Sequence, residues 1–351
     1  MLIYYSAIVY TALITFLLDI TKKTERSKFI RRILFFSVIL VLTLIAAFRW
    51  RVGTDYKTYE ILFNEYKRYK ITSLKFLIEE PGIKFISILV GKIKDDPVIM
   101  LSICSIITIP LMLNTIEKNA NSLFVASLLF IFTGVWHGTF NGVRQYLACS
   151  ILFYSHKYIL SRDFYKYLFM VFLASLFHVS AWIMLFIYFV PQGKLKFNDY
   201  FIIILISLIL YIFSPRIYNL VDIYFNKFRG DFVVDKVNIV RIAVQFAPLF
   251  FYLFFTDRSK LTQKDYLYIN ILFINAVLYL ATSRSIYLSR ILIYFSCYLC
   301  LGIDSILKIR SKKYKIIFTT LILVLFFIFW YIDISKQSTV IVYKSIFNRN
   351  Y

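Results

Sequence analysis

Acidic residues are scarce in this sequence, where 19 Asp and Glu stand against 41 Lys and Arg and leave a formal charge of +22 over 351 residues. In a soluble protein such an excess would suggest a nucleic-acid partner. Here 60% of the residues are hydrophobic, and cytoplasmic loops of membrane proteins are themselves enriched in Lys and Arg. The basic excess therefore fits a membrane protein, and we expect no nucleic-acid partner.

Cysteines and the short motifs that hold metals or nucleotides are also few. The four cysteines all lie in apolar runs, so we expect no disulfide framework. Cys297 and Cys300 have the spacing of a zinc or redox pair, but the stretch reads as a helix interior, where small buried side chains explain both. The sequence has no D-x-D motif and no glycine-rich phosphate loop, and Asp95-Asp96 lies in a charged turn. We expect neither a metal nor a cofactor.

Long uncharged runs dominate what is present, among them 33–48, 201–213 and 316–330. A membrane-spanning helix needs about 20 mostly apolar residues. The first run, Leu2–Ile20, has no basic n-region before it and no A-x-A cleavage site, so it predicts a retained helix rather than a signal peptide. We predict an all-α polytopic membrane protein with about ten transmembrane helices in one integral membrane domain, 1–351.

The basic loops orient the predicted spans. Loops 21–32 and 308–315 are strongly basic and are assigned to the cytoplasm. Residues 49–96 then form an outer-face loop with a short amphipathic or re-entrant helix at 81–93, and 214–240 form a second outer loop. The other predicted spans are 98–116, 122–136, the helix opened by Arg144, 200–213, 240–256, 266–282, 291–307 and 316–331.

The segment 164–190 is long for one helix and short for two. Charge bias favours a path out and back that turns near His178, because the later basic loops then reach the cytoplasm. In the alternative threading, 81–93 is a full span and 164–190 a single one.

Arginines gather on the predicted outer side, where charge bias would not put them. An arginine within a span costs at least about 2.5 kcal/mol, so it usually faces a cavity or a partner; snorkelling to the headgroups is the alternative. Guanidinium donors suit phosphate, and fixed arginines can stabilise a pyrophosphate leaving group without a metal. The set is Arg49, Arg51, Arg144, Arg229, Arg241, Arg284 and Arg290.

Three residues are candidate bases on the same side: His178, Asp55 and Glu80. Histidine near its ordinary pKa can take a proton from a hydroxyl, although a lone histidine in an apolar segment is often structural. Asp55 has the alternatives of pairing with Arg51 or capping a helix that begins near Tyr56. Nearby aromatic residues are candidates for stacking on sugar rings, with membrane-interface belts as the other explanation: Trp50, Tyr56, Tyr59, Trp136 and Tyr146.

Four short motifs, in this order, resemble the EpsG family of Wzy-type polysaccharide polymerases. The first is R-x-G-x-D-Y with a second tyrosine, the second E-x-G, the third N-x-x-R-Q-x-x-A, and the fourth L-A-x-x-F-H-x-S-A. A late R-x-x-x-Y pair, Arg290 and Tyr294, fits as well. The matching residues are Arg51, Gly53, Asp55, Tyr56 and Tyr59; Glu80 and Gly82; Asn141, Arg144, Gln145 and Ala148; Phe177, His178, Ser180 and Ala181.

The resemblance implies a GT-C-like, metal-independent glycosyltransferase of the bacterial cytoplasmic membrane, with its active site facing the outside. It would join lipid-linked oligosaccharide units, carried on polyprenyl pyrophosphate, into O-antigen, capsule or exopolysaccharide. Its expected neighbours are membrane lipids, a flippase and a chain-length regulator. The catalytic candidates are His178, Asp55 and Glu80, and the substrate-binding candidates are Arg51, Arg144, Arg241, Arg284, Arg290, Tyr56, Tyr59 and Gln145. A flippase for the same lipid-linked sugars and a membrane acyltransferase are the rival interpretations.

Overall fold

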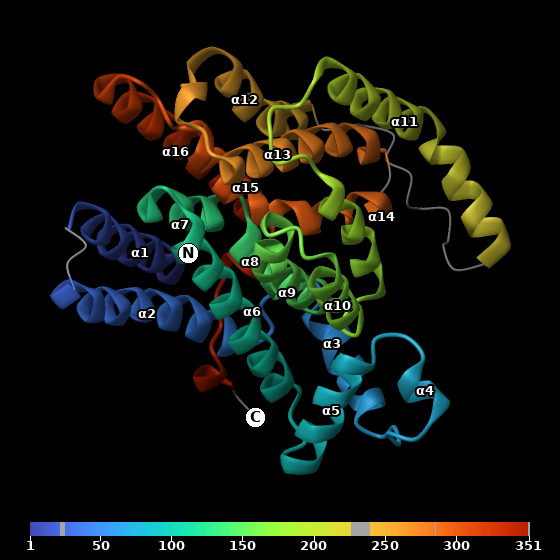
Figure 1. Ribbon diagram of the computed structural model, residues 1–351. Coiled ribbons are helices and arrows are strands. Elements are labelled where there is room, and N and C mark those ends of the chain that lie inside the picture. Colours follow the sequence, from blue (N-terminus) through green and yellow to red (C-terminus); the bar gives the residue numbers. More distant parts are fainter. Residues whose placement is uncertain (22–24, 226–238, 285, 350–351) are drawn as a thin grey trace. The chain divides into compact units, whose positions relative to one another are not determined.

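The computed structural model describes residues 1–21, 25–225, 239–284 and 286–349 (Figure 1). Over these ranges the chain is helical, and its one β-feature is an isolated bridge between Arg49 and Ser345. Two compact units are present: Met1–Tyr188 with Thr319–Tyr351, and Phe189–Phe318. Each is described by itself, and the single membrane domain over 1–351 stays a prediction.

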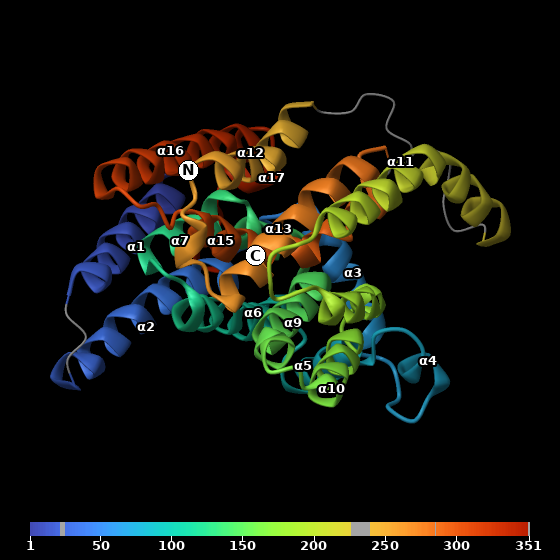
Figure 2. The ribbon, with the colours of Figure 1, turned by 45° about the horizontal axis from the view of Figure 1, so that its top comes forward.

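The first unit holds most of the helices. They are α1 (Leu2–Ile20), α2 (Glu25–Ala47), α3 (Tyr56–Tyr66), α4 (Leu74–Leu77), α5 (Pro81–Ile93), α6 (Pro97–Asn119), α7 (Leu123–Phe132), α8 (Val135–Asn141), α9 (Val143–Leu160), α10 (Phe164–Ser175), η1 (Val179–Phe189), α17 (Ser338–Ile341) and η3 (Ile346–Asn348). Helix α16 (Lys312–Ser335) begins in the second unit and ends in the first. Helices α6, α9 and α10 pack side by side (Figures 1 and 2).

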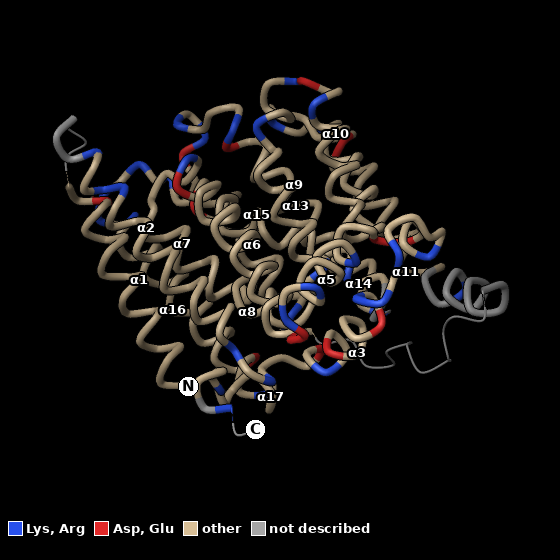
Figure 3. Tube along the Cα trace, turned by 90° about the horizontal axis from the view of Figure 1, so that it is seen from below, with Lys and Arg blue, Asp and Glu red and all other residues tan. Residues whose placement is uncertain are grey.

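Successive long helices of the first unit run in opposite directions, so their ends meet at two levels. At one level the Asp19 carboxylate, at the end of α1, accepts hydrogen bonds from the start of α7 at Ser122 and Phe124. At the other level Ser102, near the start of α6, donates to the Ala47 carbonyl at the end of α2. In Figure 3 the charged residues of this unit lie mostly at the two ends of its helices, as expected where the middle crosses lipid.

The chain reverses after α10, as the sequence predicted. The helix ends at Ser175, and η1 runs back along it: the Tyr167 hydroxyl donates to the Met184 carbonyl (2.7 Å) and Arg162 donates to the Tyr188 carbonyl (2.7 Å). The predicted reversal of the chain near His178 is therefore confirmed. Helix α5 has 13 residues, a length of about 20 Å, so it is a partial helix and not a span.

Among the residues that the structure describes, five helices are long and apolar enough to cross a membrane: α1, Lys28–Ala47 of α2, α6, α13 (Gln263–Thr282) and α16. A sixth is counted if α7 and α8 form one bent span. The all-α polytopic class is confirmed, and the prediction of about ten spans is reached only by adding shorter apolar helices. The difference arises because several predicted spans, such as Ile239–Phe255 and Leu292–Ile306, are apolar helices of 10–17 residues. In addition, the predicted span 122–136 is broken at Gly134, whose φ of +83° separates α7 from α8.

The second unit contains α11 (Phe197–Phe225), α12 (Ile239–Phe255), η2 (Arg258–Lys260), α13, α14 (Ile286–Ser289) and α15 (Leu292–Ile306). Residues 214–225, predicted as the start of an outer loop, are helical because α11 continues through Phe225. Residues 226–238 of that predicted loop lie outside the described residues.

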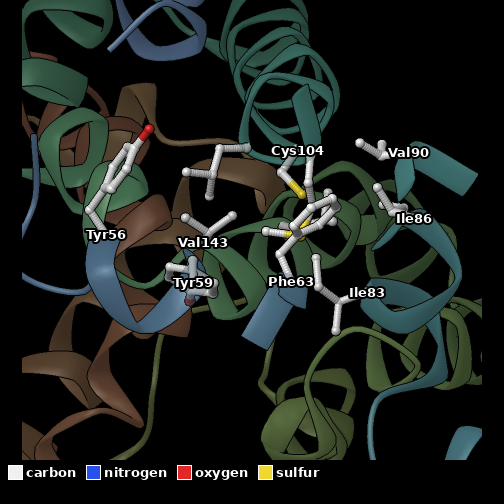
Figure 4. Packing of buried hydrophobic residues seen from close by; sticks show 11 residues of the cluster. Tyr56, Tyr59, Phe63, Ile83, Ile86, Val90, Cys104 and Val143 are labelled. Atoms are coloured by element: carbon white, nitrogen blue, oxygen red, sulfur yellow. The ribbon is translucent and has the colours of Figure 1, made fainter. Parts of the chain in front are cut away.

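A buried apolar cluster joins α3, α5, α6 and α9 within the first unit (Figure 4). Phe63 from α3, Ile83 from α5 and Cys104 from α6 point toward one another in it, and all three are buried. The cluster fixes the segment 56–93 against the long helices α6 and α9. This matters for function because the polar residues described next stand at the helix starts that the cluster holds in place.

Candidate active site at the starts of helices α5 and α9

Glu80 is the centre of a buried ion-pair cluster. Its carboxylate accepts a hydrogen bond from Arg144 Nη1 through one oxygen and pairs with His178 Nδ1 through the other. The side chain of Glu80 is 9% exposed, whereas those of Arg144 and His178 are 27% and 26% exposed. The three residues come from three motifs that are 98 positions apart at their extremes, and only the fold joins them.

The charge of Glu80 is stabilised by these partners. Burial by itself raises the pKa of the Glu80 carboxyl, but the His178 hydrogen bond and the Arg144 charge outweigh it, so the pKa lies below its ordinary value. Glu80 is therefore a carboxylate at neutral pH, suited to orienting and charge-balancing its two partners.

The backbone around Glu80 is strained in a way that aims its side chain. Glu79 and Glu80 both adopt the left-handed region, with φ of 56° and 58°, which costs about 1–3 kcal/mol per residue for a non-glycine. Pro81 then starts α5 with φ already suited to a first helical turn. Such strain persists only where surrounding contacts hold it, as the Arg144 and His178 contacts do here.

Gly82 lets the start of α5 approach the turn that carries His178. Its N–H donates to the Leu176 carbonyl (2.8 Å). A Cβ at this position would lie 2.8 Å from the Phe177 ring and 3.0 Å from the Leu176 carbonyl oxygen. The E-x-G and F-H motifs are thus two sides of one contact: Glu80 binds His178, and Gly82 leaves the room that Phe177 needs.

We expect Gly82→Ala to weaken this contact, because α5 and the 176–178 turn must move apart. The cost should be about 1–3 kcal/mol of stability, as for overpacked sites, with a larger loss of activity because Glu80 moves with Gly82. Thermal unfolding in detergent and an activity assay would measure the two effects. Equal melting temperatures and equal activity for variant and wild type would contradict the close-contact interpretation.

The loop before α3 is joined to the helix pair α8–α9 by a second set of motif residues. The Asn141 side-chain carbonyl accepts the Thr54 N–H (2.8 Å), and the Arg144 N–H donates to the Tyr59 hydroxyl (3.3 Å). Gly53 has a φ of +114° and lies against the Phe140 carbonyl. The R-x-G-x-D-Y and N-x-x-R-Q motifs therefore pack on each other.

The two arginines that flank Trp50 differ in role. Arg49 is buried and donates to the Ala46 carbonyl and to Ser105 Oγ (3.1 Å), while its guanidinium lies 5.2 Å from the centre of the Phe140 ring. It ties α2, α6 and α8 together and acts as a structural residue. Arg51 is exposed, in the left-handed region, and its guanidinium lies 5.1 Å from the Trp50 ring, where it is accessible to a ligand.

Among the other predicted residues of the first unit, Tyr56, Tyr59 and Gln145 are buried. Burial raises the pKa of Tyr56 to about 12 and also raises that of Tyr59, so both are neutral phenols. Tyr59 packs under Arg144, whose guanidinium carbon lies 6.0 Å from the ring centre. These tyrosines position Arg144 and the loop, and their burial argues against stacking on a sugar ring.

Asp55 occupies the N-cap position of α3, as one of its alternatives predicted, but within the described residues its carboxylate makes no capping hydrogen bond to that helix. It accepts a hydrogen bond from the Thr54 hydroxyl (3.4 Å). Its charge is close enough to raise the pKa of Tyr59. Asp55 therefore lies beside the cluster without joining the Glu80 ion pairs.

Arg241, Arg284 and Arg290 belong to the second unit, so their place in the site stays a prediction. Arg241 and Arg290 are exposed, and the Arg284 guanidinium lies 5.7 Å from the Tyr211 ring. Arg229 lies outside the described residues. In the part of the chain that the structure describes, no group of three His, Cys, Asp or Glu side chains could hold a metal ion.

Sequence reasoning named Glu80, Arg144 and His178 but did not connect them. It treated Glu80 as a rival of His178 for the role of base and assigned Arg144 to substrate alone. It also gave Asn141 and Gly82 no role beyond the motif. The signal that was available is the glycine of E-x-G, since glycine is the default residue where the backbone closely approaches another group.

The fold and the site together define a polytopic helical membrane protein with a buried Glu–Arg–His cluster at one end of its helices. A family comparison matches residues 32–345 to the EpsG family. The chain belongs to that family, whose members are Wzy-type polysaccharide polymerases, so its general role is in polysaccharide polymerisation. No curated protein and no solved structure matches the chain.

Proposed function

We propose that the protein joins lipid-linked oligosaccharide units into a surface polysaccharide at the outer face of the bacterial cytoplasmic membrane. The observation that carries the proposal is the position of Glu80 between Arg144 and His178. Such a cluster offers a cation and an oriented imidazole side by side, which are the two groups that a glycosyl transfer from pyrophosphate needs.

In the proposed reaction an acceptor sugar hydroxyl attacks the anomeric carbon of the donor. The bond from that carbon to the pyrophosphate oxygen breaks, its electron pair leaves with the pyrophosphate, and the hydroxyl proton passes to His178. Because Nδ1 of His178 faces Glu80, Nε2 is the ring nitrogen that takes the proton. Glu80 then stabilises the imidazolium.

Arg144 has the complementary role of stabilising the leaving group. Glu80 engages one Nη1 group of a side chain that has five donors, and the guanidinium is partly exposed. The exposed part of the guanidinium suits a phosphoryl group whose negative charge grows as the bond breaks. Arg51, exposed on the loop before α3, is a second candidate for the same anion. Fixed guanidiniums would make the reaction independent of a metal.

The test is a gel ladder of surface polysaccharide from cells that carry wild type, Arg144→Ala or His178→Ala, with membrane levels checked. We expect both variants to collapse the ladder to a single repeat unit, a loss of about 10²-fold or more in joining. Lys166→Ala is the matched control. Lys166 is an exposed cation at the start of α10, whereas His178 follows the end of that helix.

The outcome separates the rival functions. A single repeat unit on the surface means that units still cross the membrane and only joining is lost. Loss of even the single unit, with lipid-linked units accumulating inside, would instead indicate a flippase. Full-length ladders in both variants at normal membrane level would overturn the proposed mechanism.

A further inference from the structure

A polar cavity lies beside the cluster, between the α7–α8 break, the first turns of α9 and the end of α16, all within the first unit. Its volume is about 220 Å³. The residues that line it are Phe132, Thr133, Gly134, His137, Gly138, Asn141, Tyr146, Phe329, Trp330, Asp333, Ile334 and Gln337. The sequence analysis assigned no role to His137, Asp333 or Gln337.

The cavity contains a buried polar group with unused bonding capacity. His137 is 3% exposed, and its Nδ1 accepts from the Trp330 indole N–H (3.2 Å). Its Nε2 has no hydrogen-bond partner among the described residues. A buried polar atom without a partner costs desolvation free energy, so this nitrogen is a candidate hydrogen-bonding group for a ligand. Asp333, which accepts from Gln337 (3.1 Å), adds a carboxylate and an amide to the same wall.

The lining excludes some ligands and suits others. Among the residues around the cavity, all of which the structure describes, none is Lys or Arg, so a pyrophosphate would meet the Asp333 carboxylate without a cation. Carboxylate, amide and imidazole groups beside aromatic rings instead match the hydroxyls and apolar faces of a sugar ring. The volume is below the roughly 300–1,000 Å³ of sites for drug-sized molecules, which limits the ligand to about one ring.

The cavity is connected to the ion-pair cluster through the first turn of α9. Arg144 on that turn binds Glu80, whereas Tyr146, two residues later, lines the cavity. Asn141 lines it too and binds the loop that carries Asp55. We propose that this cavity binds one uncharged sugar ring of a lipid-linked repeat unit, with Asp333 and His137 bonding its hydroxyls; the identity of the ligand as a sugar rests on the proposed function.

Binding is testable without any polymerase assay. The full-length protein in nanodiscs is examined by saturation-transfer-difference NMR with glucose, galactose and N-acetylglucosamine as probes, and pyrophosphate as the anionic comparison. We expect at least one sugar to bind. Asp333→Asn should weaken it about tenfold or more, the effect of losing a charged hydrogen bond.

Two further variants locate the site. Gly138→Ala would place a Cβ 2.0 Å from the Tyr146 hydroxyl and so displace that ring, and it should also weaken sugar binding. Lys166→Ala should leave sugar binding unchanged, since this exposed lysine does not line the cavity. Absence of binding by all three sugars, or binding that Asp333→Asn and Gly138→Ala leave unchanged, would overturn the proposal. Neither result depends on whether the ladder experiment supports polymerisation.

Discussion

Replacing Glu80 with Gln should reduce polymer formation by about 10²–10⁴-fold, the range of a lost proton-transfer function, while the protein still reaches the membrane. Glutamine has the same shape, so the packing around Gly82 and Phe177 is kept. What is lost is the charge that pairs with Arg144 and holds the His178 ring. The ladder of surface polysaccharide measures the effect, and it should shorten toward one repeat unit.

The neighbouring Glu79→Gln is the matched control, because Glu79 has the same left-handed backbone but an exposed side chain. It should keep most of the polymer length. If Glu79→Gln and Glu80→Gln behaved alike, backbone strain or loop charge would explain the loss, and the orienting role of Glu80 would be wrong.

We also expect the difference in stability between wild type and Glu80→Gln to depend on pH. A carboxyl whose pKa is lower in the folded state stabilises the fold above its unfolded pKa, and that stability is lost as pH falls through the folded pKa. The pKa of Glu80 is lowered from 4.5. Wild type should therefore melt above Glu80→Gln at neutral pH, and the two melting curves should converge below pH 4.5. A constant difference down to pH 3 would contradict this.

Gly53→Ala should strongly destabilise the first unit. Its φ of +114° strains any residue with a Cβ, at about 1–3 kcal/mol. The added Cβ would also lie 2.7 Å from the Phe140 carbonyl oxygen and 2.8 Å from Asn141 Oδ1, and backbone cannot rotate away as a flexible side chain can. We expect a lower membrane level, a lower melting temperature and loss of polymer together.

Gly193→Ala is the control for this change, because no atom in the described part of the chain lies within 4 Å of a Cβ built at that position. Its effect on stability should stay within about 0.5 kcal/mol. If Gly53→Ala had the same melting temperature as wild type, the contact between the loop at 53–54 and the end of α8 would not be required for folding.

The sequence by itself determined the class and most of the helices. Apolar runs such as Leu2–Ile20 must be helical if they cross lipid, since the backbone has no other partner there, and α1 has these same bounds. The basic loops correctly indicated the reversal near His178. The motif order also identified the EpsG family, which the family comparison matches over residues 32–345.

Where regular helices stop was harder to predict, because tertiary contacts decide it. Nothing in the apolar run 122–136 shows that the chain turns at Gly134 to open α8. The run after Phe213 reads as a loop by its charges, yet α11 continues to Phe225. Amino-acid composition indicates which segments can lie in lipid, but it does not indicate where one helix packs against another and therefore ends.

Only the tertiary structure decided the chemistry of the site. Sequence reasoning valued Glu80, His178 and Asp55 as alternatives for one role, because residues far apart in the chain carry no information on their mutual distance. In the fold, Glu80 pairs with Arg144 and His178, and Asp55 lies beside them without joining these pairs. A carboxylate held between a guanidinium and an imidazole is a poor base and a good orienting group, and that distinction depends on contacts between segments that only folding brings together.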